Sequence, residues 1–297
     1  MSFAGSDRFE LRTRLGKGAF GVVYRARDVH RSADVALKTL HRVAPDALLR
    51  FKTEFRALQD LQHPNVVHFH ELFEEEGEWF FTMELVEGVE LLDWVCPERP
   101  LDPSAETLAA RFDEARLRDA LKQLAGALAA LHEAGLVHRD LKPSNVRVTP
   151  EGRVVLLDFG LVVDTAGEAD AAIVGTPAYM APEQAHSKQV GPAADLYGLG
   201  VLLFEALTGT LPFAGAPLRI ITLKQREEPP PPRVLAADVP FDLDALCEEL
   251  LRREPERRPS AKQVRRRLGR GSSTPPPSTP APDPHFVGRE LELDVLR

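Results

Sequence analysis

Hydrophobic residues in the first part of the chain recur in short runs typical of β-strands. Residues 9–84 contain several such runs, rich in Val, Phe and Leu, which predicts strands. One segment breaks this pattern, because from about Asp46 to Leu61 the apolar positions follow helical spacing, up to the turn signal "HPN". We therefore predict a small, mostly β unit that contains a single helix.

Helical spacing dominates from about Arg111 onward. The stretch "RLRDALKQLAGALAALHEAG" is closed by Gly135, and further helical stretches fall near 193–208, 242–252 and 260–268. These segments predict a larger, mostly helical unit. After Gly271 the run "SSTPPPSTPAPDP" has no core-forming residues, and its prolines predict an extended interdomain tether over 271–284.

Composition narrows the class of protein. The 297 residues, 43% of them hydrophobic with mixed charges, suit one large two-lobed domain or two ordinary domains. The net charge of −8 argues against nucleic acid or an anionic membrane surface as partner, since either needs a broad basic face, and only 252–270 is locally basic. Cys96 and Cys247 form a single distant pair, which argues against a disulfide framework or a cysteine metal site. With no apolar run of signal-peptide or membrane-helix length, we expect a soluble, cytoplasmic protein.

Two motifs near the N-terminus suit phosphate binding. The stretch "LGKGAFGVVYRA" at 15–26 places glycines where a backbone can approach a triphosphate closely, although an ordinary hairpin has similar glycines. In "VALK" at 35–38, Ala36 and Lys38 share one face of a strand, which offers room for a flat base and a cation for phosphate. A lone strand lysine is usually solvated, so neither motif is decisive by itself.

Further motifs follow in order along the chain. The loop "HRDLKPSN" at 138–145 gathers an acid, a base and an amide, and its proline keeps them out of a helix. In "LDFG" at 157–160, a carboxylate follows the apolar strand "VVLL", where it can hold a hard cation. "APE" at 181–183 and "DLYGLG" at 195–200 come next. Taken singly, "LDFG" fits a turn and Asp195 fits a helix N-cap. The order and spacing of the whole set of motifs make coincidence improbable.

Together these motifs resemble the eukaryotic-like protein kinase family over about residues 9–268. The resemblance implies an α+β, bilobal protein kinase fold: a small β-rich N-lobe (about 9–84) with one key helix, and a larger helical C-lobe (about 88–268). "DLKPSN" and "GTPAYMAPE" resemble the serine/threonine branch, and "PAYMAPEQA" and "RPSA" resemble its bacterial members. The implied activity is transfer of the γ-phosphoryl group of ATP to Ser/Thr hydroxyls of protein substrates, with Mg²⁺ or Mn²⁺ as cofactor.

The resemblance also assigns catalytic roles. Asp140 accepts or orients the proton of the substrate hydroxyl, and Lys142 steadies the γ-phosphoryl group. Asn145 and Asp158 are the implied magnesium ligands. The crowding of these side chains is then explained by the small size of the transferred phosphoryl group.

Nucleotide-binding roles are implied in the same way. Lys38 would hold the α- and β-phosphates while pairing with Glu54, and Met83 would be the gatekeeper before a hinge at 84–86 that binds adenine through its backbone. Glu90 would lie within reach of the ribose. The implied nucleotide-contacting set is Gly16, Gly18, Gly21, Val23, Ala36, Lys38, Glu54, Met83, Glu84, Val86, Glu90 and Arg147. Outside the site, Glu183 and Arg258 resemble the buried ion pair of the substrate lobe.

Arg147 departs from the family pattern, which usually has Leu or Met under the adenine. Either its aliphatic stem floors the base while the guanidinium reaches outward, or the cation weakens the pocket. On the second view Arg147→Leu tightens ATP binding, because leucine restores an apolar surface. The same departure keeps open an alternative, in which the chain is a nucleotide-binding or pseudokinase module that switches a downstream ATPase.

The segment between Asp158 and Glu183 bears on activation. Its only hydroxyls are on Thr165, Thr176 and Tyr179, and Thr176 belongs to the substrate-facing loop of the family. Where related bacterial kinases carry phosphorylated threonines, this chain has Glu168 and Asp170. These acids either replace the phosphates by pairing with Arg139 or form a solvated acidic loop.

The last residues carry a second resemblance. "FVGRELELDVLR" at 286–297 is similar to the opening of signal-transduction ATPase domains, although a short amphipathic helix fits the same residues. The resemblance implies that 285–297 begins an ATPase domain, and that the kinase is the N-terminal part of a larger bacterial signalling protein.

Overall fold

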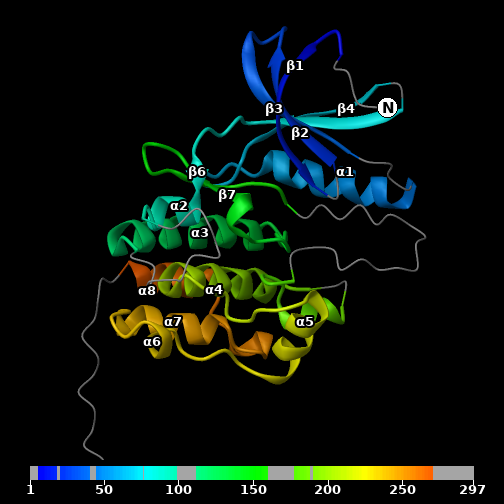
Figure 1. The fold of residues 1–297 in the computed structure, drawn as a ribbon. Helices are drawn as coiled ribbons and strands as arrows, with labels where there is room; N and C mark the ends of the chain where they lie inside the picture. Colours follow the sequence, from blue (N-terminus) through cyan, green and yellow to red (C-terminus); the bar gives the residue numbers. More distant parts are fainter. Residues whose placement is uncertain are drawn as a thin grey trace, which may run out of the picture.

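The structure is a computed structural model that describes residues 6–18, 21–40, 45–75, 77–98, 112–159, 177–187 and 190–269. A β-sheet lobe stands above a helical lobe in Figure 1. The predicted bilobal fold, with a small β-rich N-lobe and a larger helical C-lobe, is therefore confirmed. The predicted tether (271–284), the possible ATPase start (285–297) and the acids Glu168 and Asp170 lie outside the described residues.

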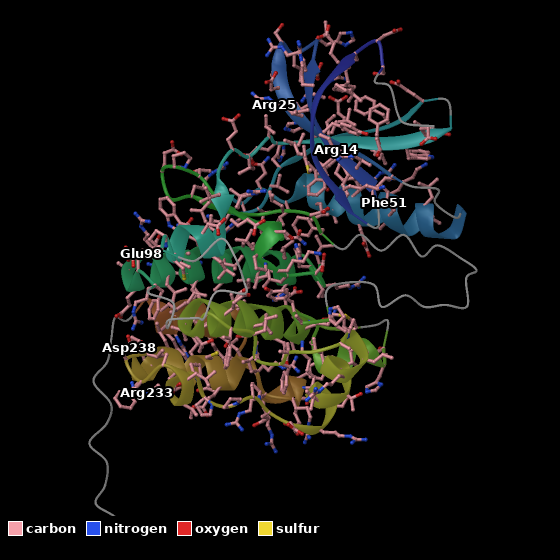
Figure 2. The ribbon with its side chains drawn as sticks, in the orientation of Figure 1. Arg14, Arg25, Phe51, Glu98, Arg233 and Asp238 are labelled. Atoms are coloured by element: carbon pink, nitrogen blue, oxygen red, sulfur yellow. The ribbon has the colours of Figure 1, made fainter. Side chains whose placement is uncertain are left out.

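The N-lobe is a five-stranded antiparallel sheet in the order β1-β2-β3-β5-β4, with one helix packed on it. Its strands and helix are β1 (Phe9–Gly18), β2 (Gly21–Asp28), β3 (Ala33–Thr39), α1 (Pro45–Asp60), β4 (Phe69–Glu75) and β5 (Glu78–Met83). Phe51, which is labelled in Figure 2, and Phe55 both project from α1 into the core. The Phe55 ring centroid lies 5.6 Å from that of Phe69 on β4 and 5.5 Å from that of Phe81 on β5. The predicted single helix is confirmed, and these aromatic contacts hold it against the sheet.

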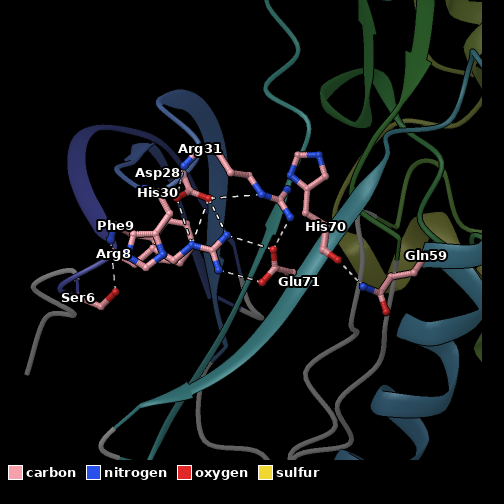
Figure 3. Close-up of polar contacts among 9 residues, drawn as sticks. All are labelled: Ser6, Arg8, Phe9, Asp28, His30, Arg31, Gln59, His70 and Glu71. Carbon is pink, nitrogen blue, oxygen red and sulfur yellow. Dashed lines mark hydrogen bonds and ion pairs between the residues drawn. The ribbon is translucent and has the colours of Figure 1, made fainter.

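Arg8 connects segments at opposite edges of the same sheet (Figure 3). Its Nη2 lies 2.7 Å from Asp28 Oδ2 at the end of β2, and its Nη1 lies 2.9 Å from Glu71 Oε2 on β4. Hydrogen bonds from this guanidinium lower the pKa of both carboxyl groups. The rings of Phe9 on β1 and Phe73 on β4 also approach to 5.1 Å. The sheet therefore curls enough for side chains from its two edge strands to touch.

The C-lobe is built around α4, a helix that is buried on every side. All its residues from Ala194 to Thr208 are buried, as expected for a helix that is apolar around its whole circumference, and it ends at Gly209 with φ of 72°.

The elements of this lobe are β6 (Val89–Glu90), α2 (Leu91–Val95), α3 (Glu114–Glu133), η1 (Pro143–Asn145), β7 (Val146–Val148), β8 (Val154–Leu156), η2 (Pro182–Ala185), α4 (Ala193–Thr208), α5 (Pro217–Arg226), α6 (Pro232–Leu235), α7 (Phe241–Leu250), η3 (Pro255–Arg257) and α8 (Ala261–Leu268). Four long helices, α3, α4, α7 and α8, were predicted within a few residues of these bounds, whereas α2, α5 and α6 were not. Within the described ranges, no helix is long and apolar enough to cross a bilayer.

A second, three-stranded sheet lies where the lobes meet and carries the loops of the candidate site. Its order is β6-β7-β8, so β7 and β8 are antiparallel neighbours. η1 immediately precedes β7, and Asp158 follows β8 by two residues. The Leu157 N–H donates to the Asn145 carbonyl at 2.8 Å, which holds the start of one strand beside the end of the other.

Candidate active site

The loop before β7 brings the three predicted polar side chains together. Lys142 Nζ lies 2.6 Å from Asp140 Oδ2. Asn145 Nδ2 donates to the Asp140 carbonyl at 2.8 Å and to Asp140 Oδ2 at 3.1 Å. Pro143 at the first position of η1 supports this tight turn, because its missing N–H needs no partner there. The Asp140 side chain remains 23% exposed and is accessible.

Asp195 holds the backbone of the same loop from below. This carboxylate accepts hydrogen bonds from the His138 N–H at 2.9 Å and the Arg139 N–H at 2.8 Å, and His132 Nε2 lies 2.9 Å from it. Arg139 has φ of 67°, a left-handed conformation that a non-glycine residue adopts only with outside support. The N-cap interpretation of Asp195 is wrong: α4 begins at Ala193, its N-cap is Pro192, and Asp195 lies inside the first turn.

His138 links this loop to the end of β8. Its ring is fully buried, and Nδ1 accepts from the Asp140 N–H at 3.3 Å. That bond places the ring proton on Nε2, which donates to the Leu157 carbonyl at 2.8 Å. The ring also packs on Phe159 at a centroid distance of 4.9 Å. The catalytic loop and the residues on either side of Asp158 therefore form one connected unit.

Lys38 is buried on β3 and forms an ion pair with Asp158. Across the sheet it faces Val23 on β2 and Phe81 on β5. The predicted pair between Lys38 and Glu54 is not formed in this structure. The Lys38 ammonium group pairs with Asp158 instead. Glu54 is half-buried on α1, where its neighbour Phe55 takes the packed position.

The predicted hinge leaves a set of backbone groups available. Met83, the predicted gatekeeper, is 6% exposed and pairs with Ala36 on β3. The Glu84 N–H donates to the His68 carbonyl at 2.9 Å, and the Glu84 carboxylate forms an ion pair with Arg153. Among the described residues, none hydrogen-bonds the Glu84 carbonyl or the N–H and carbonyl of Val86. These are the groups on which the predicted adenine contacts depend.

Arg147 on β7 pairs in register with Glu90 on β6. Its Nη1 donates to the Gly88 carbonyl at 3.4 Å, next to the hinge. Of the two alternatives for Arg147, this contact favours the one in which the guanidinium reaches outward and leaves its stem in the strand.

The three glycines within 15–26 differ in whether the surrounding atoms leave room for a side chain. Gly21 has φ of 154°, and a Cβ placed on it would lie 1.7 Å from the Thr39 carbonyl oxygen, so no other residue fits there. A Cβ on Gly16 or Gly18 would meet no atom within 4 Å. Gly21 is therefore required by the strand geometry, whereas the open space around Gly16 and Gly18 leaves room beside the hairpin.

Comparison with known proteins places this arrangement in a family. Residues 9–267 match the family model of the protein kinase domain. The chain belongs to the protein kinase family.

Several named kinases are similar to this chain over most of its length. It is 36% identical over 298 residues to serine/threonine-protein kinase PknA of Mycobacterium tuberculosis (strain ATCC 25618 / H37Rv), which covers 93% of this chain and 66% of PknA. It is 34% identical over 291 residues to serine/threonine-protein kinase PknB of Mycobacterium leprae (strain TN), which covers 93% of this chain and 44% of PknB. The chain thus spans just under two thirds of PknA and less than half of PknB. The solved structure of Rad53 1-466 in complex with AMP-PNP matches with a TM-score of 0.71 and 25% identity, over 87% of this chain and 64% of Rad53.

Two contacts outside the predicted catalytic set complete the kinase domain. The predicted pair between Glu183 and Arg258 is confirmed as a bidentate ion pair, with N to O distances of 2.6 and 2.9 Å and a fully buried Arg258 side chain. Gln184 Nε2 donates to the Arg139 carbonyl at 2.9 Å, which ties η2 to the catalytic loop. The motifs containing Asp195 and Gln184 were recognised from the sequence, but the roles of these side chains were not, because both act on backbone atoms far away in the chain.

Proposed function

We propose that this chain is an ATP-dependent serine/threonine protein kinase that transfers the γ-phosphoryl group to Ser/Thr hydroxyls of protein substrates. The observation that carries the proposal is the placement of two polar groups at the junction of the lobes: Lys38 with Asp158, and Asp140 with Lys142 and Asn145. A backbone hydrogen bond from Leu157 to Asn145 joins the two groups. These residues come from β3 and from the two loops beside β7 and β8. The names of PknA and PknB as serine/threonine-protein kinases support the same conclusion.

The residues present fit Mg²⁺, or Mn²⁺, together with ATP. Mg²⁺ is usually held by one or two protein oxygen ligands and completed by substrate phosphates. Asn145 turns its Nδ2 toward Asp140, which leaves its amide oxygen for a metal beside the Asp158 carboxylate. Among the described residues, no group of three His, Cys, Asp or Glu side chains is placed to hold a metal unaided, which suits a metal shared with phosphates. When bound, the metal supplies positive charge that stabilises the transferring phosphoryl group.

Each side chain has a role that follows from its position. The Asp140 carboxylate, with 23% of its side chain exposed, is the accessible acceptor for the proton of a substrate hydroxyl. Lys142, 2.6 Å from it, offers a cation at the same point. Lys38 offers a buried cation for the phosphates nearer the sheet. The free backbone groups of the hinge suit an adenine ring, and Rad53, a similar structure, was solved with AMP-PNP.

The catalytic roles are tested by Asp140→Asn and Lys38→Met, with Asp60→Asn and Lys122→Met as surface controls. We expect each active-site variant to lose nearly all transfer from radiolabelled ATP to dephosphorylated casein while its circular dichroism spectrum is unchanged. A positioned base typically contributes 10²–10⁴-fold. Retention of more than about a tenth of the wild-type rate in Asp140→Asn would contradict the assignment.

A nucleotide-binding switch without catalysis is the second candidate, and the feature that favours it is Arg147, which stands where the family usually has Leu or Met. The same assay separates the two functions when it is run beside a measurement of ATP binding. ATP binding by the wild type with no phosphoryl transfer, and no difference from Asp140→Asn, would establish the switch.

We also propose that the chain is the kinase part of a larger bacterial, cytoplasmic signalling protein with an ATPase domain after residue 285. The resemblance of 286–297 to ATPase domain openings supports the ATPase domain, and the similarity to mycobacterial kinases supports a bacterial protein. A full-length reading frame that lacks a phosphate-binding loop downstream would refute it.

A further inference from the structure

Lys224 is a buried lysine that faces a loop of the protein. It lies near the end of α5 with only 2% of its surface exposed, one turn after the buried Ile220. Its Nζ donates hydrogen bonds to the carbonyls of Pro177 at 2.8 Å, Ala178 at 2.5 Å and Met180 at 2.7 Å. A protonated lysine has three donors, so every donor of this ammonium group is used on one short backbone segment.

In the part of the chain that the structure describes, no carboxylate lies within ion-pair distance of the Lys224 ammonium group. It lies 5.1 Å from the centroid of the Tyr197 ring, and the guanidinium of Arg258 lies 5.0 Å from the same centroid. Burying a cation without a counter-ion is costly, and a leucine or methionine would fill the same space without that cost. The carbonyl dipoles and the aromatic ring offset part of it. An ammonium group at this position is therefore best explained by its hydrogen bonds to the backbone of residues 177–180.

The segment that Lys224 holds, residues 177–180, leads directly to the catalytic loop. Gln225, the next residue of α5, donates from Nε2 to the Pro182 carbonyl at 2.6 Å. Two residues later, Gln184 bonds the Arg139 carbonyl, next to Asp140. A continuous chain of polar contacts thus runs from α5 through 177–184 to the residue proposed to receive the substrate proton. The adjoining Thr176 belongs to the substrate-facing loop by resemblance.

We propose that Lys224 is a positioning residue for the protein substrate, because its ammonium group fixes the backbone of 177–180 where the acceptor peptide docks beside Asp140. This inference rests on the proposed serine/threonine kinase function. It predicts that Lys224 governs the affinity for the acceptor and leaves the affinity for ATP unchanged, since its contacts all lie on the substrate side of the C-lobe.

The role of Lys224 can also be tested without a substitution, through the pH dependence of the KM for the acceptor. Burial lowers the pKa of Lys224 to about 7, and loss of the proton leaves two donors for three carbonyls. The other charged or titratable groups around it are Tyr197 and Glu205 on α4, Tyr179 in the segment, and the Glu183–Arg258 pair. Burial raises the pKa of Tyr197, so this tyrosine stays neutral when Lys224 titrates. The KM for the acceptor should therefore rise between pH 6.5 and pH 8, while the KM for ATP stays constant.

The test compares Lys224→Met with Arg226→Met, which removes an exposed cation two residues along α5. Steady-state kinetics use dephosphorylated casein and ATP. Because the lost hydrogen bonds come from a charged group, we expect the casein KM to rise about tenfold in Lys224→Met, which corresponds to about 1.4 kcal/mol. The ATP KM should change less than about twofold. Arg226→Met should match the wild type in both.

The outcomes separate this inference from the proposed function. An inactive wild type that does not differ from Asp140→Asn would refute the kinase function, and the inference with it. An active wild type with an unchanged casein KM in Lys224→Met, or with casein and ATP KM raised equally, would refute the inference alone. If Lys224→Met does not fold, the wild-type pH series decides, and a constant ratio of the two KM values from pH 6.5 to 8 would overturn the role of Lys224.

Discussion

Several residues of the candidate active site are held by hydrogen bonds that involve backbone atoms. Asn145 is fixed by the Asp140 carbonyl, His138 by the Leu157 carbonyl and the Asp140 N–H, and the left-handed Arg139 by Asp195. Backbone partners do not change when a neighbouring side chain is substituted. Conservative changes at Asp140 should therefore alter chemistry and leave the shape of the loop in place.

Because the Arg147 guanidinium points outward, replacing this residue should change the dissociation constant of ATP only modestly. Because its guanidinium already lies at the Gly88 carbonyl, Arg147→Leu removes little charge from beneath the base and adds a modest apolar surface. We expect the ATP dissociation constant, measured by isothermal titration calorimetry, to fall about two- to threefold. Arg56→Leu, an exposed change on α1, is the control. Weaker binding in Arg147→Leu would show that the guanidinium itself contacts the nucleotide.

Motif residues could be identified from the sequence because their chemistry fixes both residue type and order. Asp140, Lys142 and Asn145 lie within six positions, so their proximity follows from chain connectivity. The partner of Lys38 could not be predicted in the same way, because the sequence offers both Glu54 and Asp158 as carboxylate partners and the fold brings Asp158 to it. That choice depends on how deeply α1 packs, which is a tertiary property.

Among the elements of the C-lobe, η2 is held to the segment after η3 by the Glu183–Arg258 pair. Removing one partner of a buried pair leaves an unpaired charge, so Arg258→Met should lower the free energy of unfolding by roughly 3–5 kcal/mol. Arg267→Met is the matched control, since its pair with Glu249 is 2.7 Å long but exposed, and exposed pairs contribute about 0–1 kcal/mol. Urea denaturation followed by tryptophan fluorescence measures both, and equal losses in the two variants would contradict this account.

The helices that sequence patterns predicted are those with regular apolar spacing, such as α3 and α4. α5 was not predicted, and its burial pattern explains why. Leu218 is 72% exposed on this helix, whereas Lys224 is 2% exposed. An apolar residue therefore faces solvent and a charged residue is buried, which is the opposite of the usual helical pattern. The available signal for this helix was a lysine at the apolar position one turn after Ile220. The same lysine, Lys224, holds the backbone of residues 177–180.

Activation concerns the whole molecule, because Asp158 pairs with Lys38 in the N-lobe while Glu183 pairs with Arg258 in the C-lobe. Arg139 Nε is buried and has no hydrogen-bond partner among the described residues, which suits a guanidinium that awaits an acidic partner. We expect phosphatase-treated protein to keep most of its initial rate, and Thr165→Ala to be mild. Glu168→Gln combined with Asp170→Asn should slow the enzyme severalfold, because Arg139 would then lack a charged partner.

The matched control for that double variant is Asp93→Asn combined with Glu98→Gln, which removes the same charge from exposed positions near α2. Loss of all activity on dephosphorylation, with a double amide variant that behaves like the wild type, would refute the acidic-mimic hypothesis. Thr165 would then be the leading regulatory residue.

The hydrogen bonds from Asp195 to the catalytic loop have a consequence for how this molecule loses activity. The amide protons of His138 and Arg139 are donated to a carboxylate within the most buried helix of the C-lobe, so they can be released to solvent only when that helix opens. We expect these two amides to exchange with deuterium as slowly as the central amides of α4, under global control. Thermal damage would then remove catalytic geometry and protease resistance in one step, and partially disordered but active molecules would not accumulate.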